Sequence, residues 1–385
     1  MKKLLGKMDK WLLFLTVFYA ILGLIMIFSA SSVTAVHRFH VSPYHFFVRQ
    51  ALFLMLGFAV AFTVILRLPT SKYKFFVPIL LIGILVALAG LNVYGTFVGG
   101  AQRWYNFGFI SFQPTEFAKT ILIIYLAVFY SKHANKPKVD TITYLIPLAI
   151  TFVMFMLIAM QPDLGGALIL GAISFFIFIS IPIKKNNQIK ILKLVGIGAI
   201  VLVVGLIYSG AQILSASQMR RFEFRQPCLR YLERSGYQVC NSQIAFHNGG
   251  LFGVGLGDST QKYLYLPEGH TDFIFPIIVE ELGFIIGVLL IFGYIFMLYR
   301  ILRIAKAAEN LRCSILAYGT FLFILLHILV NLLGVLALIP LTGVSLPFLS
   351  YGGSFTINII AVLFIVQRVA IENNINKNKR EIKNM

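Results

Sequence analysis

Ten apolar runs of about 18 residues or more divide this 385-residue chain, and they limit its fold more than any other feature. A run of that length crosses the hydrocarbon core of a bilayer as a helix. The predicted spans are 11–31, 47–67, 75–92, 114–131, 143–160, 163–182, 194–215, 272–299, 313–338 and 355–371. With 59% hydrophobic and 12% charged residues, the chain has too little polar surface for a soluble globule. We predict an all-α membrane protein with ten transmembrane helices in a single polytopic domain, residues 1–385.

The distribution of basic residues predicts the orientation of these spans. If the amino terminus is cytoplasmic, the inside segments and the inner ends of the spans together hold 23 of the 33 Lys and Arg residues. Short, basic inside loops are typical of proteins in the bacterial inner membrane. Both termini are therefore predicted to be cytoplasmic, and the net charge of +19 indicates this sidedness and not a nucleic-acid partner. The first run is too long for a signal-peptide core and is predicted to be a retained anchor.

A long polar segment, residues 216–271, separates the seventh and eighth predicted spans and is predicted to lie outside. A loop of this length in a compact domain usually carries function. Its six cations are Arg220, Arg221, Arg225, Arg230, Arg234 and Lys262. They suggest an anionic ligand, with contact to lipid headgroups as the alternative. The segment also holds Cys228 and Cys240, whose spacing leaves a disulfide and two free thiols equally open.

Two further outside loops are predicted. Residues 93–113 precede Pro114, which suits the start of a helix. Residues 340–354 are rich in glycine and proline, which excludes a regular helix. We predict a re-entrant or packed loop there.

Ionisable residues at the edge of a span are costly and call for a partner or a function. Asp272 lies where the long segment meets the eighth span, close to Glu268 and His270. An interfacial carboxylate beside a cationic loop suits a base that activates a sugar hydroxyl facing a pyrophosphate donor. A helix N-cap is the alternative for Asp272, and it is the favoured interpretation of Asp163.

The other acidic residues in spans have simpler explanations. Glu116 and Lys119 lie three apart on one predicted helix, which favours a structural ion pair. Glu280 and Glu281 lie deeper, where a carboxylate is expected to bond polar groups of neighbouring helices.

Several familiar chemistries lack their motifs. The sequence has no Gly-Lys-Ser/Thr of a phosphate-binding loop, no Cys-x-x-Cys and no His-Glu-x-x-His, so ATP and structural zinc are disfavoured. The glycines between 249 and 257 follow no strand and predict tight turns instead of a dinucleotide site. The sequence also lacks the Asp-x-Asp pair that binds a metal ion in many nucleotide-sugar transferases, which disfavours a nucleotide sugar as the donor.

Five motifs resemble the SEDS family of FtsW, RodA and SpoVE, and the resemblance extends from the first predicted span to the tenth. The matching segments are 100–104, 113–119, 161–165, 266–275 and 346–354. Residues 236–238 and 255–262 look more like FtsW, the division member, whereas Thr342 is similar to RodA, the elongation member.

This resemblance implies an inverting peptidoglycan glycosyltransferase that polymerises lipid II and releases undecaprenyl pyrophosphate, in septal wall synthesis. Asp272 matches the essential carboxylate of the family. Arg103, Arg221 and Lys262 become candidates to balance the pyrophosphate charge. Trp104 is expected to contact substrate or anchor its loop, and Ser350 with Tyr351 to shape the cavity. Glu116 and Lys119 match positions that matter for activity.

The resemblance also implies a class B penicillin-binding protein as partner, together with other divisome membrane proteins and membrane lipids. No cofactor is certain, and a divalent cation, Mg²⁺ or Mn²⁺, stays open. The alternatives are a lipid II flippase and a non-catalytic scaffold. A flippase would use polar residues at several depths, namely Arg49, Glu116, Glu280, His327 and Asn331.

Overall fold

The computed structural model describes residues 2–98, 101–108, 111–134, 141–183, 185–208 and 226–383. The long helices of the first half are α2 (Lys10–His37), α3 (His45–Val60), α4 (Tyr73–Tyr94), α5 (Pro114–His133), α6 (Leu145–Ala159), α7 (Leu164–Ser180) and α8 (Lys185–Tyr208). Those of the second half are α10 (Arg234–Gly249), α11 (Ile274–Lys306), α12 (Leu311–Val335) and α13 (Gly353–Lys383). Short turns are α1 (Lys2–Leu5), η1 (Ala61–Ile65), η2 (Thr70–Lys72), η3 (Thr141–Tyr144) and η4 (Pro227–Arg230).

Each predicted span overlaps one of these long helices. Within the described ranges, six helices are long and apolar enough to cross a membrane: Lys10–His37, His45–Ile65, Thr70–Leu91, Ile274–Lys306, Leu311–Val335 and Gly353–Asn378. Leu145–Ala159 and Leu164–Ser180 are shorter apolar helices. The prediction of a helical, multi-pass membrane protein is confirmed, and the count of ten spans stays a prediction.

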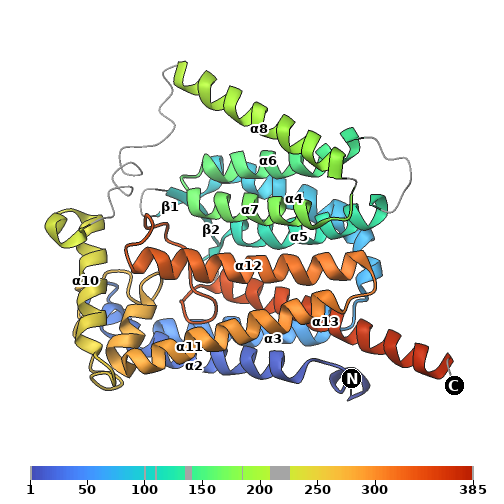
Figure 1. Ribbon diagram of the computed structural model, residues 1–385. Coiled ribbons are helices and arrows are strands. Elements are labelled where there is room, and N and C mark those ends of the chain that lie inside the picture. The colour runs from blue at the N-terminus through green and yellow to red at the C-terminus, as the bar shows by residue number, and fades with distance from the viewer. Residues whose placement is uncertain are drawn as a thin grey trace.

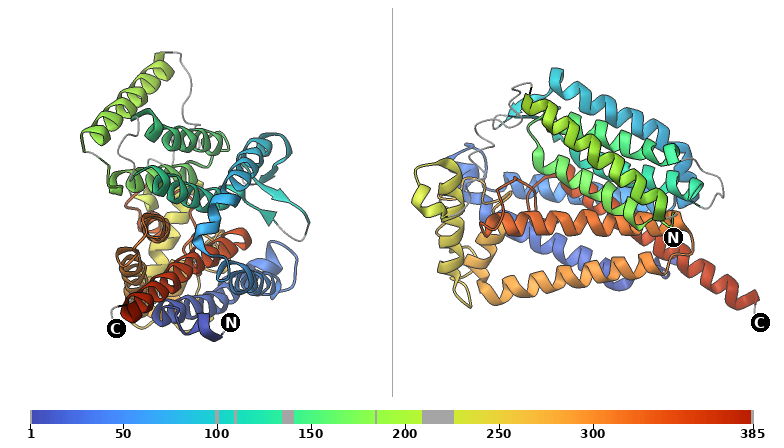
Figure 2. Two further views of the ribbon diagram at one scale, coloured as in Figure 1. Left: turned by 90° about the vertical axis from the view of Figure 1, so that its right-hand side faces the viewer. Right: turned by 45° about the horizontal axis from the view of Figure 1, so that its top comes forward.

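The long helices run side by side, and α10 lies across one end of the bundle (Figures 1 and 2). Both chain ends lie at the opposite end. There Asp9 caps α2 by accepting a hydrogen bond from the backbone N–H of Leu12 at 2.9 Å, and it also pairs with Arg300 of α11. Its own backbone N–H donates to Gln367 of α13 at 2.9 Å. Asp9 therefore ties three helices together near the termini, through its carboxylate and its backbone N–H.

The predicted loop at residues 93–113 contains a small antiparallel sheet, so the expectation of an all-α chain is corrected in detail. Its strands are β1 (Thr96–Val98), β2 (Ala101–Asn106) and β3 (Ser111–Phe112), in the order β1-β2-β3. Strands this short give little periodic signal in a sequence. As expected, α5 begins at Pro114, the first helical position.

Helix α10, inside the long polar segment, is absent from the sequence-based expectation. The glycine-rich stretch after it does form tight turns, because Gly250, Gly253, Gly255 and Gly257 all have positive φ. This stretch packs against a break in α11 at Gly283, whose φ of 88° favours glycine. There the backbone N–H of Phe284 donates to the Gly250 carbonyl at 3.0 Å.

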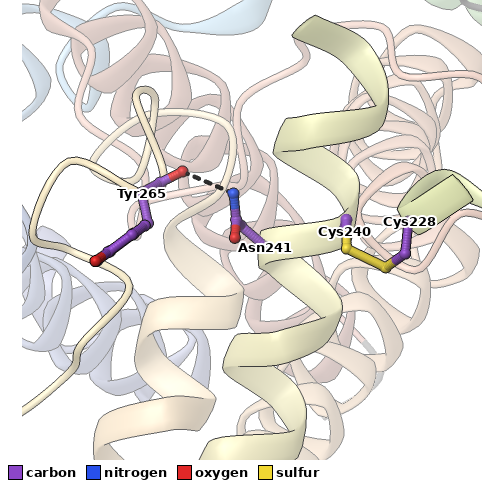
Figure 3. Close-up of a disulfide and its surroundings, with 4 residues drawn as sticks. All are labelled: Cys228, Cys240, Asn241 and Tyr265. Atoms are coloured by element: carbon purple, nitrogen blue, oxygen red, sulfur yellow. Dashed lines mark hydrogen bonds between the residues drawn. A yellow bond between two sulfur atoms is a disulfide. The ribbon is translucent and has the colours of Figure 1, made fainter. Parts of the chain in front are cut away.

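Cys228 and Cys240 form a disulfide with an S–S distance of 2.07 Å, which decides between the two alternatives left open above. The bridge joins η4 to α10 (Figure 3). The adjacent Asn241 donates to the Tyr265 carbonyl at 3.1 Å, and Ser242 donates to the Val335 carbonyl at 2.7 Å. The disulfide-bonded helix is thus attached both to the segment before α11 and to the end of α12.

We expect the double substitution Cys228→Ser and Cys240→Ser to weaken the attachment of α10. A disulfide that closes a loop of this size lowers the conformational entropy of the unfolded segment. It therefore stabilises the folded form of the segment by about 2–3 kcal/mol. Amide hydrogen exchange in α10 should therefore become faster, and a reductant should have the same effect on the unmodified chain. The matched control is Cys313→Ala, since Cys313 is a buried free thiol. Unchanged exchange in α10 would show that the bridge does not hold the helix.

Candidate active site

Asp272 lies in the turn that leads into α11, and its side chain is partly exposed. Phe273 occupies the N-cap position of that helix, so capping does not account for Asp272. Beside it runs the irregular segment from Leu336 to Gly352 between α12 and α13, which we call the 336–352 loop. Gly343 of this loop has a φ of +74°, and a Cβ built on it would lie 3.1 Å from Oδ2 of Asp272. A larger residue there would be strained and would crowd the carboxylate.

From Val344 onward the 336–352 loop is packed, as its composition predicts. Ser350 is fully buried; its Oγ donates to the Thr271 carbonyl at 2.7 Å and accepts from the N–H of Leu346 at 2.8 Å. The N–H of Tyr351 donates to the His270 carbonyl at 2.9 Å. Ser350 and Tyr351, predicted as cavity-wall residues that bind substrate, therefore hold the segment that carries Asp272.

His270 is buried, with its ring 4.7 Å from that of Phe46 and 5.9 Å from that of Tyr351. Burial lowers the pKa of His270 to about 4, and the Arg38 charge adds to the decrease. The ring is therefore neutral at physiological pH, and within the described ranges its Nδ1 has no hydrogen-bond partner. His270 supports the turn before Asp272.

Glu268 faces Arg38, a residue that the sequence analysis did not select. The two charged groups are 3.7 Å apart, and Arg38 also donates to the Pro267 carbonyl at 2.9 Å. The only sequence signal for Arg38 is its place in the predicted outside loop that follows the first predicted span. Arg49 of α3 interacts with the Tyr351 side chain. Burial raises the pKa of the Tyr351 hydroxyl, and the positive charge of Arg49 opposes that rise.

Arg103 and Trp104 lie on β2. The Arg103 guanidinium bonds the Gln161 carbonyl at 3.4 Å and the Pro162 carbonyl, and it lies 3.8 Å from Asp163. Asp163 caps α7 by accepting from the N–H of Gly166 at 3.1 Å, as predicted. Arg103 thus joins the small sheet to the start of α7. Trp104 is half-buried, and its carbonyl accepts from the Thr96 hydroxyl at 3.0 Å.

Lys262 has partners that differ from the predicted pyrophosphate. Its buried ammonium lies 3.2 Å from the Glu281 carboxylate and also donates to the Gly257 carbonyl. Ser29 of α2 completes the cluster, because its hydroxyl donates to Glu281 at 2.6 Å. This geometry favours a structural ion pair that ties the long segment to α2 and α11. Arg221, the third candidate cation, lies outside the described residues.

Glu280 takes the role expected of a deep carboxylate. It accepts hydrogen bonds from the side chains of Asn248, Ser259 and Thr260. It therefore anchors the glycine-rich stretch to α11.

Glu116 and Lys119 form a buried pair at 2.9 Å, in agreement with the predicted structural ion pair. The Lys119 ammonium is also 3.0 Å from Nε2 of His327 on α12. Nδ1 of His327 lies 2.7 Å from the Phe323 carbonyl, which can only accept, so Nδ1 carries the proton and Nε2 accepts from Lys119. The cluster joins α5 to α12 inside the bundle.

An apolar cavity of about 310 Å³ lies between α7, α12 and the first part of the 336–352 loop. Its lining includes Gly165, Leu168, Val330, Pro340 and Thr342. Thr342 directly precedes Gly343, the residue in contact with Asp272. Consecutive residues of the 336–352 loop therefore line the cavity and contact the candidate carboxylate.

Within the described ranges, no three His, Cys, Asp or Glu side chains gather in a way that could hold a metal ion. The residues around Asp272 do not form a metal site by themselves. We therefore derive no chemical step through a metal.

The buried pair gives a stability prediction. Lys119→Met leaves the Glu116 carboxylate buried without its partner and should destabilise the protein by about 3–5 kcal/mol. The double variant Lys119→Met, Glu116→Gln should lose less than the sum of the two single variants, because neither charge is then left alone. Thermal unfolding in detergent measures all four proteins, and additive losses would contradict the coupling.

His270 gives a pH prediction. Its pKa is about 4 in the folded protein and about 6.5 when unfolded, so the unfolded chain binds more protons between these values. Stability should therefore be complete above pH 6.5 and fall as the pH drops towards 4, by at most about 3 kcal/mol. His270→Asn should have a flatter dependence between pH 7 and 5. Equal slopes for both proteins would assign the dependence to other groups.

Comparison with known proteins identifies the family of this chain. The model of a cell cycle protein family that covers FtsW, RodA and SpoVE matches residues 10–375. A Bacillus subtilis relative named probable peptidoglycan glycosyltransferase FtsW is 39% identical over 391 residues, covering 99% of this chain and 95% of the relative.

Two solved structures are also similar. One belongs to a peptidoglycan synthase complex that coordinates polymerisation and crosslinking, with a TM-score of 0.73 and 27% identity over 94% of this chain and 97% of that chain. The crystal structure of the rod shape determining protein RodA from Thermus thermophilus has a TM-score of 0.65 and 28% identity, over 94% and 96% of the two chains. The family model and the curated relatives show that this chain belongs to the FtsW, RodA and SpoVE family.

Proposed function

We propose that this protein polymerises lipid II at the site around Asp272, as an inverting glycosyltransferase that serves septal wall synthesis. The enzyme class agrees with the names of its relatives, which are peptidoglycan glycosyltransferases of the FtsW type at 30–39% identity. The resemblance to FtsW at 236–238 and 255–262 favours division over the elongation role of RodA.

The observation that carries the proposal is the position of Asp272 between two environments. Its carboxylate is partly exposed and lies against Gly343, where a larger side chain would crowd it. Thr342, the residue before Gly343, lines the apolar cavity. A lipid-linked sugar needs this combination, because its polyprenyl chain requires apolar surroundings while its sugar and pyrophosphate require polar ones.

In the proposed reaction, the 4-hydroxyl oxygen of the acceptor sugar attacks the anomeric carbon of the donor. The bond from that carbon to the pyrophosphate oxygen breaks, and undecaprenyl pyrophosphate leaves with the bonding electron pair. Asp272 accepts the proton of the attacking hydroxyl as a general base, or it positions the acceptor sugar for the attack. Among the predicted cations, Arg103 and Arg221 stay candidates to stabilise the leaving group, because Lys262 is buried against Glu281.

We further propose ten spans with both termini in the cytoplasm and Asp272 facing the outside, within a single domain. The chain ends lie opposite α10 in Figure 1. The disulfide beside α10 suits an oxidising compartment, which is outside the cytoplasm in bacteria.

A crosslinking partner completes the proposal. The similar peptidoglycan synthase complex couples polymerisation to crosslinking, which supports a class B penicillin-binding protein as the partner of this chain. Other divisome proteins and membrane lipids remain predicted partners. A flippase is less well supported, because Glu116, Lys119 and His327 are occupied with one another inside the bundle.

The proposal predicts that Asp272→Asn abolishes glycan synthesis from purified lipid II in the complex with the cognate transpeptidase. Loss of a general base commonly costs about 10²–10⁴-fold in rate. Asp258→Asn is the matched control, since Asp258 lies in the same polar segment and should retain activity. Assembly of each complex is checked by co-purification.

Two results would count against this assignment. If Asp272→Asn polymerises as fast as the unmodified protein, Asp272 is not the reacting carboxylate. If no protein polymerises although the complexes are intact, a flippase or scaffold becomes the better interpretation.

A further inference from the structure

Three successive backbone carbonyls before α11 each accept a hydrogen bond from outside their own segment. The His270 carbonyl accepts from the Tyr351 N–H at 2.9 Å, and the Thr271 carbonyl accepts from the Ser350 hydroxyl at 2.7 Å. The Asp272 carbonyl accepts from Nδ2 of Asn331 at 2.8 Å. Two of these donors come from the 336–352 loop, and the third comes from α12.

Asn331 also bonds the other wall of the site. Its Nδ2 donates a second hydrogen bond to the Val344 carbonyl at 2.8 Å, so both amide hydrogens are used. The side chain is buried, and in the described part of the chain its Oδ1 has no partner. The orientation of the amide is therefore set by the two carbonyls, because turning it over would bring an oxygen against both acceptors.

The two carbonyls held by Asn331 flank the candidate reaction centre. One belongs to Asp272 itself, and the other belongs to the residue after Gly343, which lies against the Asp272 carboxylate. A single amide thus fixes the separation between the peptide that carries the carboxylate and the peptide that follows Gly343, the residue against the carboxylate.

We propose that Asn331 is a positioning residue for Asp272, a role that rests on the proposed function. Nothing in its sequence context distinguishes it from a polar residue in a translocation path. Without the amide, the segment before α11 and the 336–352 loop keep the other two bonds but lose the one at Asp272. A shift of about 1 Å at a reacting group can cost about 100-fold in rate, so even a local relaxation affects catalysis.

The test uses Asn331→Leu, which matches the amide in size and lacks its donors, and Asn331→Asp, which keeps the shape and replaces the donors by oxygen. Both should lower kcat for lipid II polymerisation by about 10–100-fold. KM should stay within about threefold, because the remaining contacts to substrate are unchanged. Thr320→Val is the matched control: Thr320 is buried on the same helix, and its hydroxyl donates to the Leu316 carbonyl of that helix.

A double-mutant cycle separates positioning from general support of the fold. If Asn331 acts through Asp272, adding Asn331→Leu to Asp272→Asn should cause no further loss of rate per folded molecule. Losses that multiply in the double variant, or a kcat of Asn331→Leu equal to that of Thr320→Val, would overturn the inference.

The outcome is distinguishable from failure of the proposed function. If Asp272→Asn is inactive and the Asn331 variants are fully active, Asn331 has no positioning role and the proposed role of Asp272 stands. A fully active Asp272→Asn removes the proposed base and, with it, the inference. Hydrogen exchange at residues 270–275 gives a readout besides activity, and it should become faster in Asn331→Leu and stay unchanged in Thr320→Val.

Discussion

The hydrogen bonds between the 336–352 loop and the turn before α11 are the interaction on which the candidate site depends. Irregular backbone at the edge of a membrane bundle persists only where its N–H and carbonyl groups find partners inside the protein. Here the two irregular segments satisfy each other, through Ser350 and Tyr351 on one side and Thr271 and His270 on the other. The partly exposed carboxylate of Asp272 therefore stands on a rigid base without belonging to a regular element.

The remaining buried charges serve mainly to attach segments to the bundle. Lys262 and Glu281 fasten the long polar segment to α11, while Glu116 and Lys119 join α5 to α12 with the help of His327. Each group has its countercharge within 3.2 Å, which offsets the cost of removing it from water. Asp272 differs from these carboxylates because it is partly exposed, as a group that meets a substrate must be.

Several features of the site could be predicted from the sequence, and others could not. Asp272 stood out because a carboxylate at the end of a span is costly and its neighbours are polar. Lys262 was expected to meet an anionic ligand, yet it meets Glu281, because the glycine turns fold the segment back on the break at Gly283. Asn331 and Arg38 have no motif of their own, and their importance appears only when their carbonyl and carboxylate partners are known.

The sequence by itself determined that this is a helical membrane protein of the FtsW, RodA and SpoVE family, because apolar length and short motifs are local properties of a chain. It also indicated that residues 340–354 could not form one regular helix. Only the tertiary structure decided which polar groups face each other: the disulfide between Cys228 and Cys240, the pairing of Lys262, and the place of Asn331 between two carbonyls. These contacts join residues far apart or in irregular segments, and no periodicity or spacing in the sequence encodes their distance.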